Sequence, residues 1–287
     1  MERGGNEFFV GEPPYQMYVQ YWAPGAGAPD RPYPLVLVHG AAHTGVAWTS
    51  TPDGRPGWAP YFAERGWPVY VVDWPGVGRS GHVPNFLGMG SSPVVDALVS
   101  LLRRIGPSVM LGHSMGGAMT FLTAGRAPEE VRAMVLVTAS APANTAPVRP
   151  AVTLAEPVVY DRAQARALLG ESEALSQDIY EHYYRSLVPI SPRIMNAALH
   201  QNEDFRVECP EVVRSRPILF IVAEQDVMIS PDRSGPAAAF FGVVPTMVGA
   251  DWGLSGHGHM LIIAPGNLEV AARVSAWLDA LPCDDGR

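Results

Sequence analysis

A serine set between two glycines is the residue in this sequence most clearly arranged for chemistry. The segment Gly112-His113-Ser114-Met115-Gly116 follows an apolar run at residues 109–111 and precedes a stretch with helical character. On so tight a strand-to-helix turn the serine hydroxyl is held out for attack, and the glycines remove β-carbons that would collide. A serine that only caps the helix is the alternative, because Ser is a favoured N-cap residue. The flanking glycines favour a nucleophile.

The composition excludes several other kinds of chemistry. The chain has 287 residues, a formal net charge of −8 and no lysine, so its 20 basic residues are all arginines. Schiff-base catalysis, pyridoxal phosphate attachment and a Walker-type phosphate loop all need a lysine. The negative charge disfavours a nucleic-acid partner. The histidines and cysteines lack metal-ligand spacing, so we expect neither a metal nor another cofactor.

Nothing in the sequence indicates secretion or a membrane anchor. No apolar run approaches the ~20 residues that span a bilayer, and residues 1–5 lack the features of a signal peptide. Cys209 and Cys283 are far apart, so we expect two reduced thiols rather than a disulfide. The sequence therefore predicts a cytoplasmic protein with no membrane partner, and a homodimer is left open.

Strands and helices alternate along most of the chain and would position the serine. Residues 7–10 and 16–22 are expected to form an antiparallel hairpin. Continuous apolar runs, typical of strands buried on both faces of a parallel sheet, occupy residues 35–38, 69–72, 109–111, 131–137, 218–222 and 243–248. Helical patterns occupy residues 58–65, 92–105 and 267–281. This alternation predicts an α/β fold with a mostly parallel, doubly wound sheet.

One segment interrupts the alternation, because residues 142–214 contain no convincing buried strand. We expect a helical cap there, inserted after the sixth strand, with residues 1–141 and 215–287 forming the core domain. Its expected helices lie at about 163–169, 172–187 and 192–201. The middle one carries Tyr180, Tyr183 and Tyr184. Any one of these rings could simply pack the cap onto the core, but as a group they are expected to line a pocket, and Tyr180 and Tyr184 are the expected substrate contacts.

Together these features resemble the α/β-hydrolase superfamily over nearly the whole chain. The Gly-x-Ser-x-Gly turn and the His39-Gly40 pair after an earlier strand carry the resemblance. Within the superfamily, residues 39–58, 73–80 and 258–268 are similar to a group of bacterial serine carboxylesterases. The resemblance implies the α/β-hydrolase fold and a triad that runs serine, acid, histidine along the chain.

The resemblance places the catalytic base after the last strand, where His257 and His259 both lie. A base is required because a serine hydroxyl attacks poorly until a neighbour takes its proton. The esterase pattern Gly-x-x-His-Met falls on Gly256 and His259, so His259 is the expected base and His257 a loop histidine. His113, beside the nucleophile, is expected to pack beneath it.

The acid, which must hold the imidazole in the correct tautomer, is expected after the strand that follows the cap. Asp226 falls there on the fold's Gly-x-x-Asp pattern, with Ala223 in place of the glycine. Glu224 is the alternative carboxylate. Some similar esterases carry the acid one strand earlier, but the matching residue here is Thr138, which cannot become an anion. Asp226 is therefore the expected acid.

Backbone N–H groups must stabilise the oxyanion that forms during attack. The resemblance assigns these donors to Met115, after the nucleophile, and to Ala41, in the loop that His39 is expected to orient. Ala42 is the less favoured substitute and an expected substrate contact, because its small side chain lets an acyl group approach. Residues 43–58 are too rich in turn formers for a helix, and we expect them to form a pocket wall with Trp48.

These residues predict a serine hydrolase that cleaves carboxylic esters through an acyl-enzyme. The apolar, aromatic cap indicates a medium-sized hydrophobic small-molecule substrate. One alternative is other chemistry with the same triad, namely lactone or thioester hydrolysis, C–C cleavage or cyclisation in a biosynthetic pathway. A second is a non-catalytic ligand-binding protein built on a hydrolase scaffold.

Overall fold

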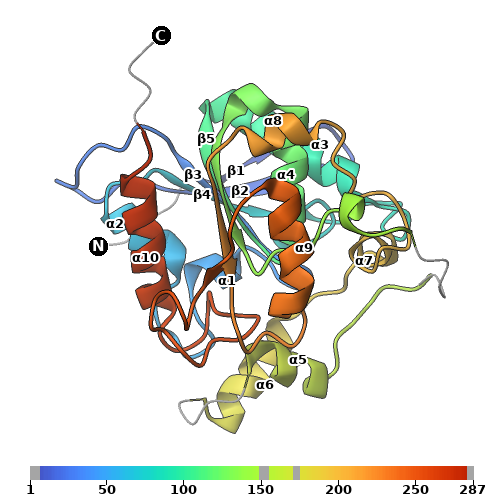
Figure 1. Ribbon diagram of the computed structural model, residues 1–287. Helices are drawn as coiled ribbons and strands as arrows, with labels where there is room; N and C mark the ends of the chain where they lie inside the picture. The colour runs from blue at the N-terminus through green and yellow to red at the C-terminus, as the bar shows by residue number, and fades with distance from the viewer. Residues whose placement is uncertain (1–6, 149–154, 171–174, 283–287) are drawn as a thin grey trace.

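A central sheet orders the whole chain in the computed structural model, which describes residues 7–148, 155–170 and 175–282 (Figure 1). The sheet has eight strands in the order β1-β2-β4-β3-β5-β6-β7-β8. β1–β2 and β2–β4 pair antiparallel, and every other pair is parallel. The strands are β1 (Glu7–Val10), β2 (Met17–Trp22), β3 (Leu35–Val38), β4 (Val69–Asp73), β5 (Ser108–His113), β6 (Val131–Val137), β7 (Ile218–Val222) and β8 (Thr246–Met247). The predicted doubly wound, mostly parallel sheet is confirmed.

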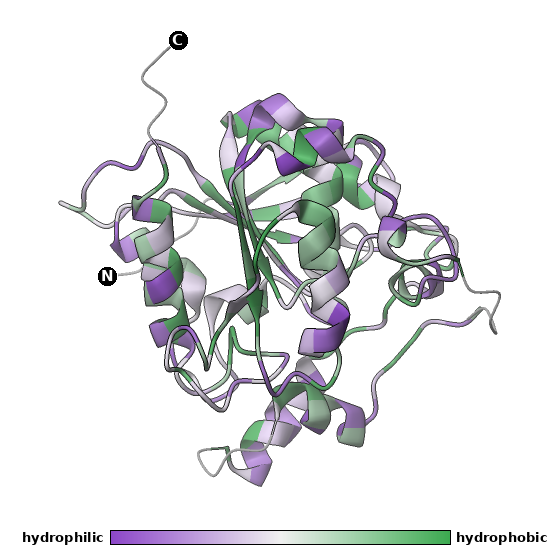
Figure 2. Ribbon diagram, in the orientation of Figure 1, coloured by the Kyte–Doolittle hydropathy of each residue, from purple (hydrophilic) through white to green (hydrophobic). Residues whose placement is uncertain are grey.

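Helices cover both faces of this sheet. α2 (Trp58–Glu64) and α10 (Asn267–Asp279) pack together on one face, while α3 (Ser91–Ile105), α4 (Met115–Arg126) and α9 (Pro231–Phe241) cover the other (Figure 1). Because both faces are covered, the strands need apolar side chains on each side. Every residue of β3 is accordingly buried, and the strands form the apolar centre in Figure 2.

Two strand predictions differ in outcome. The leading hairpin forms as expected, with Phe9 opposite Tyr18. The run at 243–248 pairs only at Thr246–Met247, at the edge of the sheet. Val244 there is exposed, and Pro245 has no N–H to donate to a neighbouring strand. An apolar run therefore gave a two-residue edge strand rather than a buried one.

Two helices depart from the sequence expectations. α9 was not predicted, because Gly235 and Pro236 lie in its interior and both disfavour helix. The prediction that residues 43–58 contain no helix is wrong for one turn, α1 (Val46–Thr49). Thr49 closes that turn by donating its hydroxyl to the Val46 carbonyl at 3.2 Å.

The segment between β6 and β7 carries the helices expected of a cap. These are α5 (Arg162–Leu169), α6 (Gln177–Ser186), α7 (Pro192–Ala198) and α8 (Pro210–Arg214). α5 and α6 pack on each other beyond the carboxyl edge of the sheet (Figure 1). α8 instead packs against α4 in the helical layer, so the chain rejoins the core before residue 214. The start of the predicted helix at 172–187 lies outside the described residues, and the division into core and cap stays a prediction.

The helices and the cysteines bear on where the protein works. No helix in the described parts of the chain is long and apolar enough to cross a membrane. Cys209 is an exposed free thiol, and Cys283 lies outside the described residues. The cytoplasmic location and the homodimer stay predictions.

Candidate active site

Ser114 sits at the turn between β5 and α4, at the edge of the sheet where parallel strands end. Its backbone has φ 54° and ψ −123°, a strained conformation for a residue with a side chain. The close packing of this turn explains its glycines, since a β-carbon on Gly116 would lie 2.2 Å from the Val38 carbonyl oxygen. The Ser114 hydroxyl makes no capping hydrogen bond to the helix, which disfavours the N-cap alternative.

The structure brings Ser114, His259 and Asp226 into one hydrogen-bonded chain. The Ser114 Oγ lies 3.0 Å from His259 Nε2, and His259 Nδ1 lies 2.8 Å from Asp226 Oδ2. A carboxylate only accepts, so Nδ1 carries the proton and Nε2 is free to accept one from the serine. The three residues are 8 %, 4 % and 3 % exposed, so this chain of polar groups is shielded from water.

The two candidate acids have different surroundings. The second oxygen of Asp226, Oδ1, accepts hydrogen bonds from the backbone N–H groups of Met228 at 2.7 Å and Ile229 at 2.8 Å. These bonds fix the carboxylate with its other oxygen toward the imidazole. Glu224 is exposed and accepts instead from the backbone N–H groups of Gly249 and Ala250. The geometry therefore favours Asp226.

The other histidines near the site are held as structural groups. The His257 ring lies against Gly266 at the start of α10, and burial lowers its pKa. His113 packs against His259 with 5.0 Å between ring centroids, and its Nε2–H donates to the His259 carbonyl at 2.9 Å. Burial first, and then the neighbouring His259, hold the pKa of His113 well below its usual value, so this imidazole is neutral. Thr138, at a positive φ of 42°, donates its hydroxyl to the same carbonyl at 3.3 Å.

Residues 40–45, which we call the oxyanion loop for the expected role of Ala41, lie beside Ser114 and are pinned by His39. The His39 Nδ1–H donates to the Gly40 carbonyl at 2.8 Å, and its Nε2 accepts from the Trp74 N–H at 3.2 Å. A trans peptide is planar, so a fixed Gly40 carbonyl also fixes the opposite direction of the Ala41 N–H. Met115 is the first residue of α4, and the first N–H groups of a helix have no acceptor within it. The expected oxyanion donors are thus the fixed N–H of Ala41 in the loop and the N–H of Met115 at the first turn of α4.

The end of the oxyanion loop is tied to an ion pair between the buried Asp73 and the exposed Arg79. The Asp73 carboxylate accepts from the Gly45 N–H at 2.6 Å and from Arg79 Nε at 2.9 Å. Burial raises the pKa of Asp73, but the hydrogen bonds from the side chain and backbone of Arg79 and from the Gly45 N–H lower it more, so the net shift is downward. The ionised carboxylate therefore anchors the loop from behind the site.

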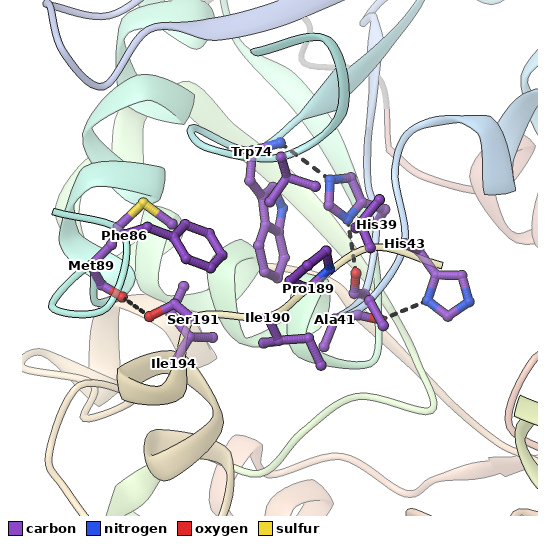
Figure 3. A pocket seen from close by; sticks show the side chains of 14 residues that line it. His39, Ala41, His43, Trp74, Phe86, Met89, Pro189, Ile190, Ser191 and Ile194 are labelled. Carbon is purple, nitrogen blue, oxygen red and sulfur yellow. Dashed lines mark hydrogen bonds between the residues drawn. The ribbon is translucent and has the colours of Figure 1, made fainter. Parts of the chain in front are cut away.

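A cavity opens directly on the oxyanion loop (Figure 3). It is bounded by the loop on one side and by residues 188–194 of the predicted cap on the other. Apolar side chains supply most of its wall, among them Trp74, Val77, Phe86, Met89, Ile190 and Ile194. Ala42, an expected substrate contact, also lines this cavity. The six apolar residues were not predicted, because no sequence pattern marks the loops that meet there.

Three expected pocket residues are placed elsewhere. Trp48 is wholly buried and packs against Trp58, 5.4 Å between ring centroids, so it supports the loop from the core. The Tyr180 hydroxyl donates to the Gly170 carbonyl at 2.5 Å, within the predicted cap. Tyr184 lies under the Arg162 guanidinium. The neighbouring Tyr183 is the ring that reaches the oxyanion loop, where its hydroxyl lies 2.8 Å from His43 Nε2.

Comparison with known proteins agrees with this fold. The sequence profile of the α/β-hydrolase fold family matches residues 33–192. The chain is 24 % identical to a probable secreted lipase, phiG, of a fungal species (strain ATCC 74256), over 92 % of this chain and 86 % of the lipase. Among solved structures, the esterase RhEst1 of Rhodococcus sp. superposes with a TM-score of 0.67 at 19 % identity, over 97 % of this chain and all of that one. A thermophilic esterase of Thermogutta terrifontis superposes with a TM-score of 0.67 at 16 % identity, over 96 % of this chain and 98 % of the esterase.

The chain therefore belongs to the α/β-hydrolase fold family. The profile covers more than half of the sequence and includes the nucleophile turn and the oxyanion loop. The structural likenesses, at under 25 % identity, bear on the fold alone. The expected resemblance is confirmed at the level of the family.

Proposed function

We propose that this α/β hydrolase cleaves carboxylic esters through an acyl-enzyme formed on Ser114. The observation that carries the proposal is the position of the His259 ring, which touches the serine at 3.0 Å and Asp226 at 2.8 Å. That arrangement supplies a nucleophile, a base and a group that orients the base. The lipase and esterase names of the relatives described above support an ester substrate.

The mechanism follows from the two ring nitrogens of His259, of which Nε2 faces Ser114 and Nδ1 faces Asp226. As the Ser114 oxygen bonds to the ester carbonyl carbon, its proton passes to His259 Nε2, and Asp226 stabilises the imidazolium. When the tetrahedral intermediate collapses, the same proton moves to the leaving alkoxide, and the alcohol departs. Water then attacks the acyl-enzyme, giving one proton to His259, which returns it to the Ser114 oxygen as the carboxylic acid leaves.

The negative charge of each tetrahedral intermediate falls on the former carbonyl oxygen. The N–H groups of Ala41 and Met115 are the proposed donors to it, and removing one such donor costs ~3 kcal/mol of transition-state stabilisation in other hydrolases. The low exposure of the site strengthens these hydrogen bonds, because water does not compete for them.

The apolar cavity beside the oxyanion loop supports a hydrophobic substrate. Trp74, Phe86 and Ile194 can bury an alkyl or aryl group next to Ala42, and such burial contributes about 0.8 kcal/mol per CH₂.

A series of p-nitrophenyl esters of graded acyl length tests the proposal. We expect kcat/KM to rise from acetate to a medium-chain ester and then fall, and Ser114→Ala to abolish turnover with every ester. Incorporation of one ¹⁸O from labelled water into the acid product would distinguish hydrolysis from cyclisation or acyl transfer. Turnover that survives Ser114→Ala, or a preference for charged acyl groups, would contradict the proposal.

A further inference from the structure

His43 joins the oxyanion loop to the predicted cap. Its Nδ1 lies 2.6 Å from the Ala41 carbonyl, and its Nε2 lies 2.8 Å from the Tyr183 hydroxyl in α6. A carbonyl only accepts, so Nδ1 carries the proton and donates it, and Nε2 accepts from the tyrosine O–H. The two rings also stack, with 5.7 Å between centroids. The contact joins residues 140 positions apart in the sequence.

A second hydrogen bond ties the same loop to the same part of the chain. The Val188 N–H, just after α6, donates to the Ala42 carbonyl at 2.9 Å. Ala42 has a φ of 60°, a conformation that costs free energy for a residue with a β-carbon and persists only when its surroundings hold it. The carbonyls of Ala41 and Ala42 are therefore both fixed by groups outside the loop's own backbone.

Fixing these carbonyls constrains the oxyanion donor. The Ala41 residue lies between two planar peptides, and His39 fixes the one before it. His43 fixes the one after it, through the Ala41 carbonyl. With both peptide planes set, the φ and ψ of Ala41 have no freedom, and neither does the direction of its N–H. His39 belongs to the sheet edge, whereas His43 takes its own orientation from Tyr183.

The protonation states of His43 and Tyr183 keep the hydrogen bond between them in place. Burial, and less strongly the neighbouring His39 and His259, lower the pKa of His43 to about 3, against the hydrogen bond to Ala41, which raises it. Burial raises the pKa of Tyr183 well above its usual value. Nε2 therefore remains an acceptor and the tyrosine remains a donor throughout the neutral range.

We propose that Tyr183 is a positioning residue of the ester-cleaving site, which acts through His43 to hold the Ala41 N–H toward the oxyanion, so that docking of α6 completes the oxyanion site. The inference rests on the proposed function and deepens it. It gives the predicted cap a part in transition-state stabilisation as well as in covering the substrate.

Tyr183→Phe tests the proposal, because it removes the hydroxyl and keeps the ring. With p-nitrophenyl butyrate we expect kcat to fall about tenfold and KM to change less than twofold, since the donor acts on the transition state. The Ki of an alkyl trifluoromethyl ketone, whose serine adduct places an oxyanion at the same position, should rise by the same factor as kcat/KM falls. A merely structural role would not produce this proportionality.

Two further variants complete the test. Tyr160→Phe removes the hydroxyl of another buried tyrosine, for which the described residues show no hydrogen bond to the oxyanion loop, and should leave kcat and Ki unchanged. A double variant combines Tyr183→Phe with His43→Ala. Its kcat should be no lower than that of His43→Ala alone, because Tyr183 acts through His43. Thermal melts of each variant correct the rates for folded protein.

The outcomes separate this proposal from the function on which it rests. An active wild-type enzyme with unchanged kcat and Ki in Tyr183→Phe would overturn the proposal alone. Losses that add in the double variant, or that follow only the fraction of folded protein, would also overturn it. A wild-type protein that neither turns over esters nor binds the ketone would overturn both.

Discussion

At the scale of single residues, the proposed chemistry depends on a hydrogen-bonded chain from Ser114 through His259 to Asp226. Ser114 could be predicted from its Gly-x-Ser-x-Gly turn after a predicted buried strand, whereas His259 and Asp226 were predicted from the resemblance to the α/β hydrolases. Trp48, Tyr180 and Tyr184 could not be placed in this way. Apolar spacing shows that a ring will be buried, but the rotation of its helix against the partner decides which ring reaches the site.

Replacing Asp226 by asparagine tests the assignment of the acid. The amide can hold the imidazole in the wrong tautomer, so we expect kcat to fall by a factor on the order of 10⁴ with little change in KM. Steady-state kinetics with p-nitrophenyl butyrate measures both kcat and KM of the variant. Glu224→Gln should keep near wild-type turnover, because among the described residues Glu224 accepts its hydrogen bonds from the backbone of Gly249 and Ala250 and none from His259. The reverse result would assign the acid to Glu224.

At the scale of elements, the site depends on how closely α4 approaches β3 and β5. Most of the predicted strands and helices of the core formed because their apolar patterns are strong and both faces of the sheet are covered. The cap was predicted only as helices within a segment. Its contacts with the oxyanion loop depend on single hydrogen bonds, such as Val188 to Ala42, and no sequence pattern records those.

Two glycines of α4 should respond in opposite ways to alanine. In Gly116→Ala the new β-carbon would lie 2.2 Å from the Val38 carbonyl oxygen, so we expect a loss of about 2–4 kcal/mol in the free energy of unfolding, together with loss of activity. In Gly125→Ala the nearest atom is a methyl group of Val213 at 3.6 Å. There the helix should gain about 0.5–1 kcal/mol at unchanged activity.

Urea unfolding followed by fluorescence measures both changes, and ester turnover measures the activity. Equal effects of the two substitutions would show that the nucleophile turn is not as tightly packed as the structure has it.

At the scale of the whole molecule, burial keeps several histidines neutral and couples stability to pH. Burial lowers the pKa of His39, His43 and His113, that of His43 to about 3. Between this value and the ordinary value near 6.5, the unfolded chain binds protons that the native protein does not. The free energy of unfolding should therefore be highest above pH 6.5 and decrease as the pH falls below it.

Urea denaturation at pH 7.5 and pH 5.0 measures this decrease. His43→Gln should reduce the difference between the two pH values, because it removes one buried group that titrates only on unfolding. The exposed His82 offers a matched control, since His82→Gln removes a histidine without emptying a buried site. Stability that rises on acidification to pH 5.0 would contradict the buried, neutral state of these histidines.

Trapping the covalent intermediate tests most directly whether Ser114 is the nucleophile that forms the acyl-enzyme. Wild-type protein mixed with a p-nitrophenyl ester is quenched in acid within milliseconds, digested, and analysed by mass spectrometry. We expect the acyl group on the peptide that contains Ser114, and none in Ser114→Ala. In His259→Ala the acylated fraction should be larger, because deacylation slows more than acylation. An acyl group on another residue, or steady turnover with an unmodified serine peptide in every variant, would contradict this role of Ser114.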